Sequence, residues 1–600
     1  MTASEAGIFW LEFDPASSNN LLRKATADGA QPVTSADFGI RSQVNGYGGG
    51  AVCAGADAVF AVEANQQQIH RIDPQTGLTK AIIRDPDASF GGLAWDHRHR
   101  RVLAVRESKG HQQLVAVQGH NRFLTLHDSE DFYSAPALSS SGSRIAWVSW
   151  SLPDMPWVRS ALWVADVGAD GRLTAARCWP TPTAGSVQQP AFDGEELHVL
   201  SDHAGWWQPW AVSFTAGRAR WRCLDPTEAD HASAPWQLGE RHHCPLERGR
   251  WARVRYIAGS AELWLKLTAG LPPARVATDY ADFRHLTVCN GHLYCIARSA
   301  SRLDSVLAVN LENGRVQTIA GGETPFPGTP IVTPRAFRIP PSRGVHEEVS
   351  GFWYPPLGGE SGNQPPALIL IAHGGPTSTA WPVFNPQVQF WCHHGFAVAE
   401  VNYRGSAGFG RDFRLALAGS WGEADVEDME RAADYLVASG RGDARRLFIQ
   451  GRSSGGYTAL MAMTRSQRFR AGASLFGVSD PGRLREVTHR FESGYLDWLL
   501  GAADEFSGRW QERTPVLQAH RIRGPMIFFQ GGQDRVVVPE QTRAMVEVLE
   551  QNGQAVELWW FEEEGHGFRQ RHNQIALLEN LLAFYQRHSQ KCNDGARQLR

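Results

Sequence analysis

The pattern of hydrophobic and polar positions divides the chain into two halves. From about residue 5 to residue 325, short β-rich stretches alternate with turns of Gly, Asp, Asn and Ser, and helical periodicity is weak. From about residue 335 onward, apolar strands alternate with helical stretches, which predicts a mostly parallel sheet with helices on its faces. We expect one domain over residues 1–330, a second over 335–590 and a polar tail over 591–600.

The first half repeats a strand at a regular spacing. Comparable apolar strands are expected at residues 9–13, 59–62, 102–105, 145–148, 197–200, 254–257 and 293–296. The intervals of about 40 to 57 residues match the size of one four-stranded propeller blade. A pair of packed β-sheets would not repeat at this period. The pattern predicts an N-terminal β-propeller, for which seven blades is our count and six or eight are the alternatives.

The second half has the apolar stretches of a doubly wound sheet. Strands are expected at residues 367–372, 396–401, 447–450, 471–476, 525–530 and 556–561, with helices over 423–437 and 539–551 among them. In such a sheet, ligands bind at the carboxyl ends of the strands. The chemistry of this half should therefore come from the residues that directly follow these strands.

One of these strands runs into a glycine-flanked serine. Gly451 and Gly455 enclose Ser453, and a helical pattern follows. This is the sequence of a nucleophile elbow, in which the serine occupies a strained turn and small residues are required because neighbouring chains pass close by. A Gly-x-Ser-x-Gly pattern also occurs in ordinary glycine turns, so its context decides.

The context supplies a base and a group that orients it. A serine hydroxyl is a weak nucleophile at neutral pH and needs both. Asp534 follows the strand at 525–530, and His566 lies between two glycines after the strand at 556–561. The order Ser, Asp, His is that of an α/β-hydrolase. We therefore predict Ser453, Asp534 and His566 as the catalytic residues.

A turn after the strand at 367–372 supplies a candidate oxyanion hole. His373-Gly374-Gly375 would present main-chain N–H groups to the negative charge that develops during attack. We predict Gly375 and Ser454, the residue after the nucleophile, as the two donors. A structural His-Gly-Gly turn is the alternative.

The motifs of the second half resemble those of the prolyl oligopeptidase family of serine peptidases, and the bacterial acylaminoacyl peptidases and related aminopeptidases are the nearest branch. The resemblance covers roughly residues 335 to 590. It implies an α/β-hydrolase catalytic domain together with a β-propeller. The motifs that carry it are His373-Gly374-Gly375-Pro376, Asn402-Tyr403-Arg404-Gly405-Ser406, Gly451-Arg452-Ser453-Ser454-Gly455-Gly456, Asp534-Arg535-Val536-Val537-Val538-Pro539 and Gly565-His566-Gly567.

The resemblance also implies a substrate pocket. Phe491 and Tyr495 lie in a stretch similar to the one that lines the first specificity pocket of the family, and Val537 would join them from the Asp534 loop. Such an apolar pocket favours an uncharged P1 side chain. Packing inside a helical core is the alternative for the two aromatic residues.

One departure from the family concerns the substrate's N-terminus. Aminopeptidase members often carry Glu at the start of a glycine-rich propeller turn where this chain has Gly46, and acids in a later turn where it has residues 156–161, including Val158 and Ala161. Acids there would bind a free α-amine. Their absence favours N-terminally acylated peptides, although other acids could take over.

Composition limits the partners and the compartment. A formal net charge of -3 gives no electrostatic footprint for nucleic acid or an anionic membrane. We expect no signal peptide and no membrane span. The eight scattered cysteines fit reduced thiols in a cytoplasm better than a disulfide framework.

We expect no metal or other cofactor, because His242-His243-Cys244 and Cys392-His393-His394 lack partners at a zinc spacing. Assembly into a homo-oligomer stays open.

Together these features predict a cytoplasmic serine peptidase that hydrolyses short peptides or N-terminally acylated peptides through an acyl-enzyme. An amidase, esterase or acyltransferase that acts on a small peptide-like metabolite is the first alternative. An interaction module with an inactive hydrolase domain is the second, and the complete set of Ser453, Asp534 and His566 argues against it.

Overall fold

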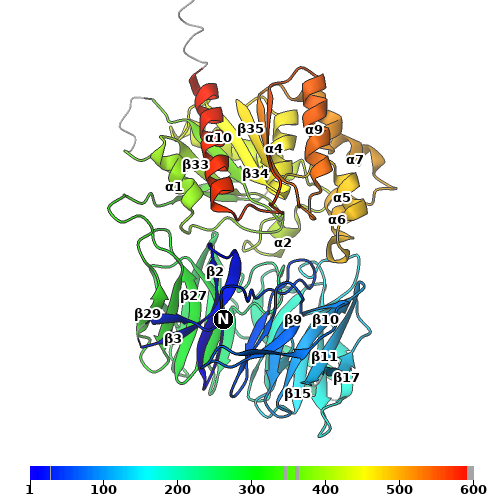
Figure 1. Cartoon of the computed structure of the whole chain (residues 1–600). Helices are drawn as coiled ribbons and strands as arrows, with labels where there is room; N and C mark the ends of the chain where they lie inside the picture. Colours follow the sequence, from blue (N-terminus) through cyan, green and yellow to red (C-terminus); the bar gives the residue numbers. More distant parts are fainter. Residues whose placement is uncertain (28, 120, 216, 342–346, 359–363, 591–600) are drawn as a thin grey trace, which may run out of the picture. The chain divides into compact units, whose positions relative to one another are not determined.

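The chain forms two compact units, which Figure 1 traces along the sequence. The computed structural model describes residues 1–27, 29–119, 121–215, 217–341, 347–358 and 364–590. Unit 1 consists of Met1–Glu323 together with two short segments from the second half, Gly408–Arg411 and His489–Gly494. Unit 2 contains the remaining described residues. The tail expected at 591–600 lies outside the described residues.

Unit 1 contains seven antiparallel sheets in the part that the structure describes. Each sheet is built from one continuous stretch of chain. In chain order the sheets are β1 (Thr2–Ser4), β2 (Gly7–Asp14), β3 (Asn19–Thr26), β4 (Gly29–Pro32); β5 (Val52–Ala54), β6 (Val59–Val62), β7 (Ile69–Ile72), β8 (Thr79–Ile83); β9 (Ala88–Asp96), β10 (Arg101–Ser108), β11 (His111–Gly119), β12 (Arg122–His127); β13 (Phe132–Tyr133), β14 (Ala137–Leu138), β15 (Arg144–Trp150), β16 (Ala161–Val167), β17 (Leu173–Trp179); β18 (Val187–Asp193), β19 (Glu196–Ser201), β20 (Gln208–Thr215), β21 (Arg218–Cys223); β22 (His243–Leu246), β23 (Arg250–Ile257), β24 (Ser260–Lys266), β25 (Ala274–Val276); and β26 (Asp282–Cys289), β27 (His292–Arg298), β28 (Ser305–Asn310), β29 (Val316–Gly321).

This arrangement confirms the predicted propeller and the count of seven blades. The seven repeated strands of the sequence pattern fall within β2, β6, β10, β15, β19, β23 and β27, which occupy equivalent places in their sheets. Strand β26 of the last sheet contacts β1 of the first, so the ring closes. Strands β6, β10, β15 and β19 are buried along most of their length, which explains why they appear in the sequence as continuous apolar stretches.

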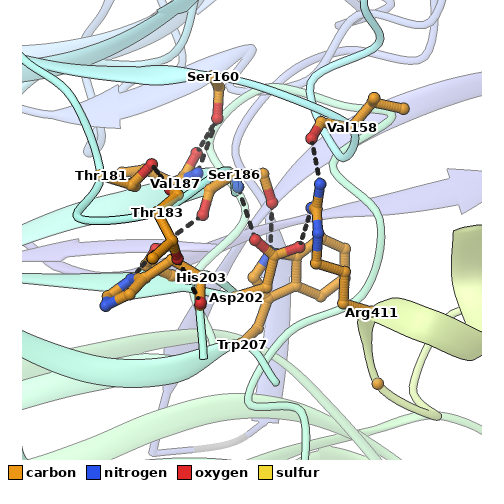
Figure 2. Close-up of polar contacts among 12 residues, drawn as sticks. Val158, Ser160, Thr181, Thr183, Ser186, Val187, Asp202, His203, Trp207 and Arg411 are labelled. Atoms are coloured by element: carbon orange, nitrogen blue, oxygen red, sulfur yellow. Dashed lines mark hydrogen bonds and ion pairs between the residues drawn. The ribbon is translucent and has the colours of Figure 1, made fainter. Parts of the chain in front are cut away.

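A buried ion pair holds one of the two short segments in unit 1. Within Gly408–Arg411, Arg411 Nη1 lies 2.8 Å from Asp202 Oδ2, as Figure 2 shows, and the side chain of Asp202 has no exposed surface. Gly410 N–H donates to Asp230 Oδ2 at 2.9 Å. A buried carboxylate needs such partners, because an unpaired charge in the interior is costly.

Unit 2 is built on one eight-stranded sheet. Its order is β30-β31-β33-β32-β34-β35-β36-β37. The last six strands in the sequence are parallel and match the six predicted strands, which confirms the mostly parallel doubly wound sheet. The strands are β30 (Arg335–Ile339), β31 (Val349–Tyr354), β32 (Leu368–Ala372), β33 (Ala397–Asn402), β34 (Leu447–Arg452), β35 (Ala471–Leu475), β36 (Met526–Gly531) and β37 (Val556–Phe561). Strands β30 and β31 add an antiparallel edge that the sequence pattern does not predict.

Helices cover both faces of this sheet. On β35, Ala471 and Ala473 belong to a buried cluster with residues of α1 and α10, whereas a Cβ at Gly472 between them would meet Met463 of α4. Because alternate strand residues point to opposite faces, α4 lies on the face away from α1 and α10. The helices are α1 (Pro386–His393), α2 (Arg411–Leu415), α3 (Ala424–Ala438), α4 (Ser454–Arg465), α5 (Pro481–Val487), α6 (Tyr495–Leu500), α7 (Ser507–Glu512), α8 (Pro515–Gln518), α9 (Pro539–Gln551) and α10 (Arg571–Gln590), with 3₁₀ turns η1 (Arg490–Glu492) and η2 (Ala519–Arg521). Within the described residues, none of these helices has the length and hydropathy needed to cross a membrane.

Candidate active site

Ser453 occupies a strained turn between β34 and α4. Its backbone has φ 53° and ψ −124°, a conformation that non-glycine residues rarely adopt. Such a conformation costs about 1–3 kcal/mol and persists only where the surrounding structure enforces it. The Ser453 side chain makes no capping bond to α4, which leaves the hydroxyl free for other partners.

Two close approaches of main chain explain the flanking glycines. A Cβ at Gly451 would lie 2.1 Å from the carbonyl oxygen of Gly455. A Cβ at Gly455 would lie 2.1 Å from the carbonyl oxygen of Ala372, at the end of β32. No side chain fits at either position, so glycine is required for the turn that presents Ser453.

His566 contacts both of its predicted partners. Its Nε2 lies 3.0 Å from Ser453 Oγ, and its Nδ1 lies 2.8 Å from Asp534 Oδ2. The other carboxylate oxygen of Asp534 accepts hydrogen bonds from the N–H groups of Val536 at 2.9 Å and Val537 at 3.0 Å. Because the Asp534 carboxylate accepts a hydrogen bond from Nδ1–H, the unprotonated Nε2 is left to accept a hydrogen bond from the Ser453 hydroxyl. The structure thus brings together three side chains from three separate loops.

Glu564 fixes the loop that carries His566, a role that sequence reasoning misses. Its buried carboxylate accepts hydrogen bonds from Arg569 N at 2.9 Å, Gln570 N at 2.8 Å and Asn573 Nδ2 at 3.0 Å. These donors lie at and just before the start of α10. An acidic residue shortly before a helix is the available sequence signal, because it can satisfy the free N–H groups of the first turn.

The loop after β32 is braced by side chains from the loop after β33. His373 Nε2 lies 2.7 Å from Ser406 Oγ, and the His373 ring stacks on Tyr403 at a centroid distance of 4.2 Å. Tyr403 also donates its hydroxyl to the His373 carbonyl at 2.8 Å. Burial lowers the pKa of His373 to about 4, so this histidine is neutral at pH 7 and serves the loop's structure.

The glycines that follow His373 lie beside the serine. A Cβ at Gly374 would be 3.9 Å from Ser453 Cβ, which places this main chain next to the nucleophile position. Gly375 has φ 123°, a value that favours glycine. The donor roles of Gly375 and Ser454 stay predictions.

A buried carboxylate supports the start of α4 from α3. Asp425 has no exposed surface, and it accepts hydrogen bonds from Gly422 N–H and from Thr458 Oγ1, each at 2.6 Å. Thr458 lies one turn after Ser454 and also donates to its carbonyl at 3.3 Å. Burial raises the pKa of Asp425 to about 6. From the sequence, Asp425 would be interpreted only as an acid in the first turn of α3 that stabilises the helix dipole.

The predicted pocket residues have different surroundings. The Tyr495 hydroxyl lies 2.7 Å from Thr377 Oγ1, and Val537 contacts Asp534 through its main chain. Phe491 belongs to unit 1, where it is 2% exposed and meets the rings of Tyr47, Phe132, Trp150, Trp157 and Trp236. The roles of Phe491, Tyr495 and Val537 in a substrate pocket stay predictions.

Gly46 and Val158 lie beside basic side chains in unit 1. Gly46 has φ 77°, and a Cβ there would lie 2.9 Å from the imidazole of His489. In the later turn, the Val158 carbonyl accepts a hydrogen bond from Arg411 Nη2 at 3.0 Å, as Figure 2 shows. Residue 46 therefore lies next to an imidazole, and the turn at Val158 lies next to a guanidinium.

The fold of unit 2, with a nucleophile elbow at the end of β34 and a histidine between Ser453 and Asp534, defines an α/β-hydrolase. Residues 382–592 match the model of the prolyl oligopeptidase family. The chain therefore carries a domain of the prolyl oligopeptidase family of serine peptidases, which confirms the resemblance.

Similar proteins include two curated relatives that match part of the chain. The chain is 30% identical to dipeptidyl aminopeptidase BIII of Pseudoxanthomonas mexicana over 36% of its own length and 33% of the relative's. It is 28% identical to the acylamino-acid-releasing enzyme of Sus scrofa over 38% and 32% of the two lengths. These matches span about a third of the curated relatives.

A solved structure matches nearly the whole chain. The chain is similar to a puromycin-hydrolyzing peptidase of Mycobacterium tuberculosis at 29% identity and a TM-score of 0.91. This match covers 98% of the chain and 94% of the solved structure, so both units have counterparts in it.

Proposed function

We propose that the protein is a serine peptidase in which Ser453 attacks the substrate carbonyl. His566 takes the serine proton through Nε2 and returns it to the leaving amine, while Asp534 orients His566 and stabilises its charged form. Water then hydrolyses the acyl-enzyme by the same route in reverse. The observation that carries the proposal is the pair of contacts from His566 to Ser453 and Asp534.

We further propose that Gly375 and Ser454 donate to the oxyanion, and that Phe491, Tyr495 and Val537 contribute to the recognition of the P1 side chain. The position of Gly374 beside Ser453 supports the first role.

The catalytic domain would correspond to residues 335–590 and the propeller domain to 1–330. A cytoplasmic location is proposed because the cysteines in the described residues are free thiols.

The substrate proposed is a short peptide or a peptide-like amide. The whole-chain likeness to a puromycin-hydrolyzing peptidase supports an amide with a free α-amine, since puromycin is an aminoacyl amide of that kind. The lack of acids at Gly46, Val158 and Ala161 and the likeness to an acylamino-acid-releasing enzyme support acylated peptides. We place the free amine first, because the likeness to the puromycin-hydrolyzing peptidase covers 98% of the chain at 29% identity, whereas the likeness to the acylamino-acid-releasing enzyme covers 38% of it. Hydrolysis of a small amide metabolite is the second candidate function, and the likeness to the puromycin-hydrolyzing peptidase supports it as well.

A matched substrate set tests these proposals. It contains one peptide with a free amine, the same peptide acetylated, and puromycin as the small amide. Wild-type protein should cleave at least the free-amine peptide, with kcat/KM about tenfold above that of its acetylated partner. Ser453→Ala should reduce hydrolysis of every substrate by about 10³-fold or more. Failure to cleave any member would contradict the proposed function, and preference for the acetylated peptide would move acylated substrates to first place.

A further inference from the structure

An exposed arginine directly precedes Ser453. Arg452 is the last residue of β34, and it is the exposed member of a strand whose other five residues are buried. The guanidinium stays charged at all working pH values and offers five N–H donors. A permanent positive charge therefore lies one residue from the nucleophile.

Arg452 is held by a neutral group. Its Nη2 donates to the side-chain oxygen of Gln387 at 3.0 Å, in the first turn of α1. No carboxylate among the described residues forms an ion pair with Arg452. Arg404, by contrast, is neutralised by an ion pair with Asp428. Desolvation by surrounding protein atoms lowers the pKa of Arg452, although its side chain stays open to solvent, and no acidic neighbour contributes to the shift. Most of its donors thus remain available for an anion from outside the protein.

We propose that Arg452 binds the C-terminal carboxylate of the peptide fragment that leaves during cleavage. This inference rests on the proposed peptidase function and names the substrate class more narrowly. Every unmodified linear peptide carries this carboxylate, and guanidinium groups bind carboxylates with paired hydrogen bonds. Arg452 would make the enzyme selective for short peptides that end shortly after the scissile bond.

The geometry limits how many residues can follow the scissile bond. An extended residue spans about 3.5 Å, and adjacent Cα atoms are about 3.8 Å apart. An arginine attached one residue from Ser453 is long enough to meet a carboxylate one or two residues beyond the bond, which is the fragment that we assign to it. In longer substrates the carboxylate would lie out of reach, and an amidated C-terminus would offer no negative charge.

Hydrolysis of matched peptide acids and amides tests the inference. The pair shares the acyl part and a Gly-Gly leaving fragment, and it differs only in a free or amidated C-terminus. Wild-type kcat/KM should favour the acid about tenfold, as expected for one charge-assisted pair at an exposed site. Arg452→Gln should bring this ratio to about one while leaving the amide's kcat/KM within about twofold. Equal cleavage of both peptides by wild-type protein would overturn the inference.

Arg535→Gln is the matched control. Arg535 is also exposed and also adjoins a proposed catalytic residue, Asp534. Its substitution should leave the ratio of acid to amide unchanged. If Arg535→Gln abolishes the preference and Arg452→Gln does not, Arg452 is not the carboxylate-binding residue.

A binding measurement separates this inference from the proposed function. Calorimetry with Ser453→Ala, with and without Arg452→Gln, measures the affinity for the same acid and amide peptides. If the peptide acid binds more tightly than the amide and this difference requires Arg452, the carboxylate site is supported. A wild-type protein that hydrolyses neither peptide would count against the proposed peptidase function but not against this site. Equal affinity for both peptides contradicts the carboxylate site.

Discussion

His566 Nδ1 lies 2.8 Å from an oxygen of Asp534, whose side chain has no exposed surface. The second oxygen of this carboxylate is held by two main-chain N–H groups of its own loop, from Val536 and Val537. The carboxylate is therefore fixed in place before a substrate arrives, and it can orient the imidazole and stabilise its charged form.

Asp534→Asn tests the orienting role. The amide offers no negative charge and can donate to Nδ1, which favours the wrong tautomer of His566. We expect kcat to fall by about 10³- to 10⁴-fold with little change in KM. Steady-state kinetics on a short peptide measures the loss, and the melting temperature controls for folding. A loss of less than tenfold in a folded variant would show that His566 does not depend on Asp534.

Glu564→Ala tests the support of the histidine loop. The substitution removes the acceptor of the N–H groups of Arg569 and Gln570 and of the buried Asn573 side-chain amide, and loss of the one buried contact costs about 1–3 kcal/mol. We expect a lower melting temperature and a fall in kcat of about tenfold or more. Glu563→Ala, at the exposed neighbouring position, is the matched control and should change neither. Equal behaviour of the two variants would contradict the role of Glu564.

Arg411→Met should destabilise unit 1, because it leaves the buried carboxylate of Asp202 without its cation. Breaking a buried pair in this way costs about 3–5 kcal/mol. Thermal unfolding measures the effect. Adding Asp202→Asn to the first substitution should recover part of the loss, since it removes the uncompensated charge. Additive losses in the double variant would indicate that the two side chains do not interact.

Asp425 should make stability depend on pH. Burial raises its pKa to about 6, above the value of about 3.9 in an unfolded chain. The folded protein therefore binds more protons between these values, so the contribution of Asp425 is greatest below pH 4 and is lost as pH rises through about 6. Between pH 4 and pH 7, the wild type should lose about 2 kcal/mol of unfolding free energy relative to Asp425→Asn. Denaturation curves of both proteins across this range measure the difference, and parallel pH profiles would contradict it.

The sequence predicts the parts of this protein that depend on local pattern. The strand before Ser453, the helix over 539–551 and the seven repeated propeller strands all follow from periodicity and turn residues. The contact of His566 with Asp534 could be anticipated, because parallel strands end at one edge of a sheet.

Contacts between distant segments escape such reasoning. Asp425 belongs to the acidic start of a helix in the sequence, yet its carboxylate is buried against Thr458 of another helix. Ser406 and Tyr403 brace His373 only because β32 and β33 are neighbours in the sheet. Hydrogen bonds formed by tertiary packing leave no periodic signal.

Covalent labelling can show whether Ser453 is the nucleophile. A fluorophosphonate should label the wild-type protein at one residue, and mass spectrometry of the digested protein should place the adduct on Ser453. Ser453→Ala should remain folded and take up no label, whereas Ser454→Ala should still be labelled. Stoichiometric labelling of Ser453→Ala, or an adduct on Ser454, would contradict the account.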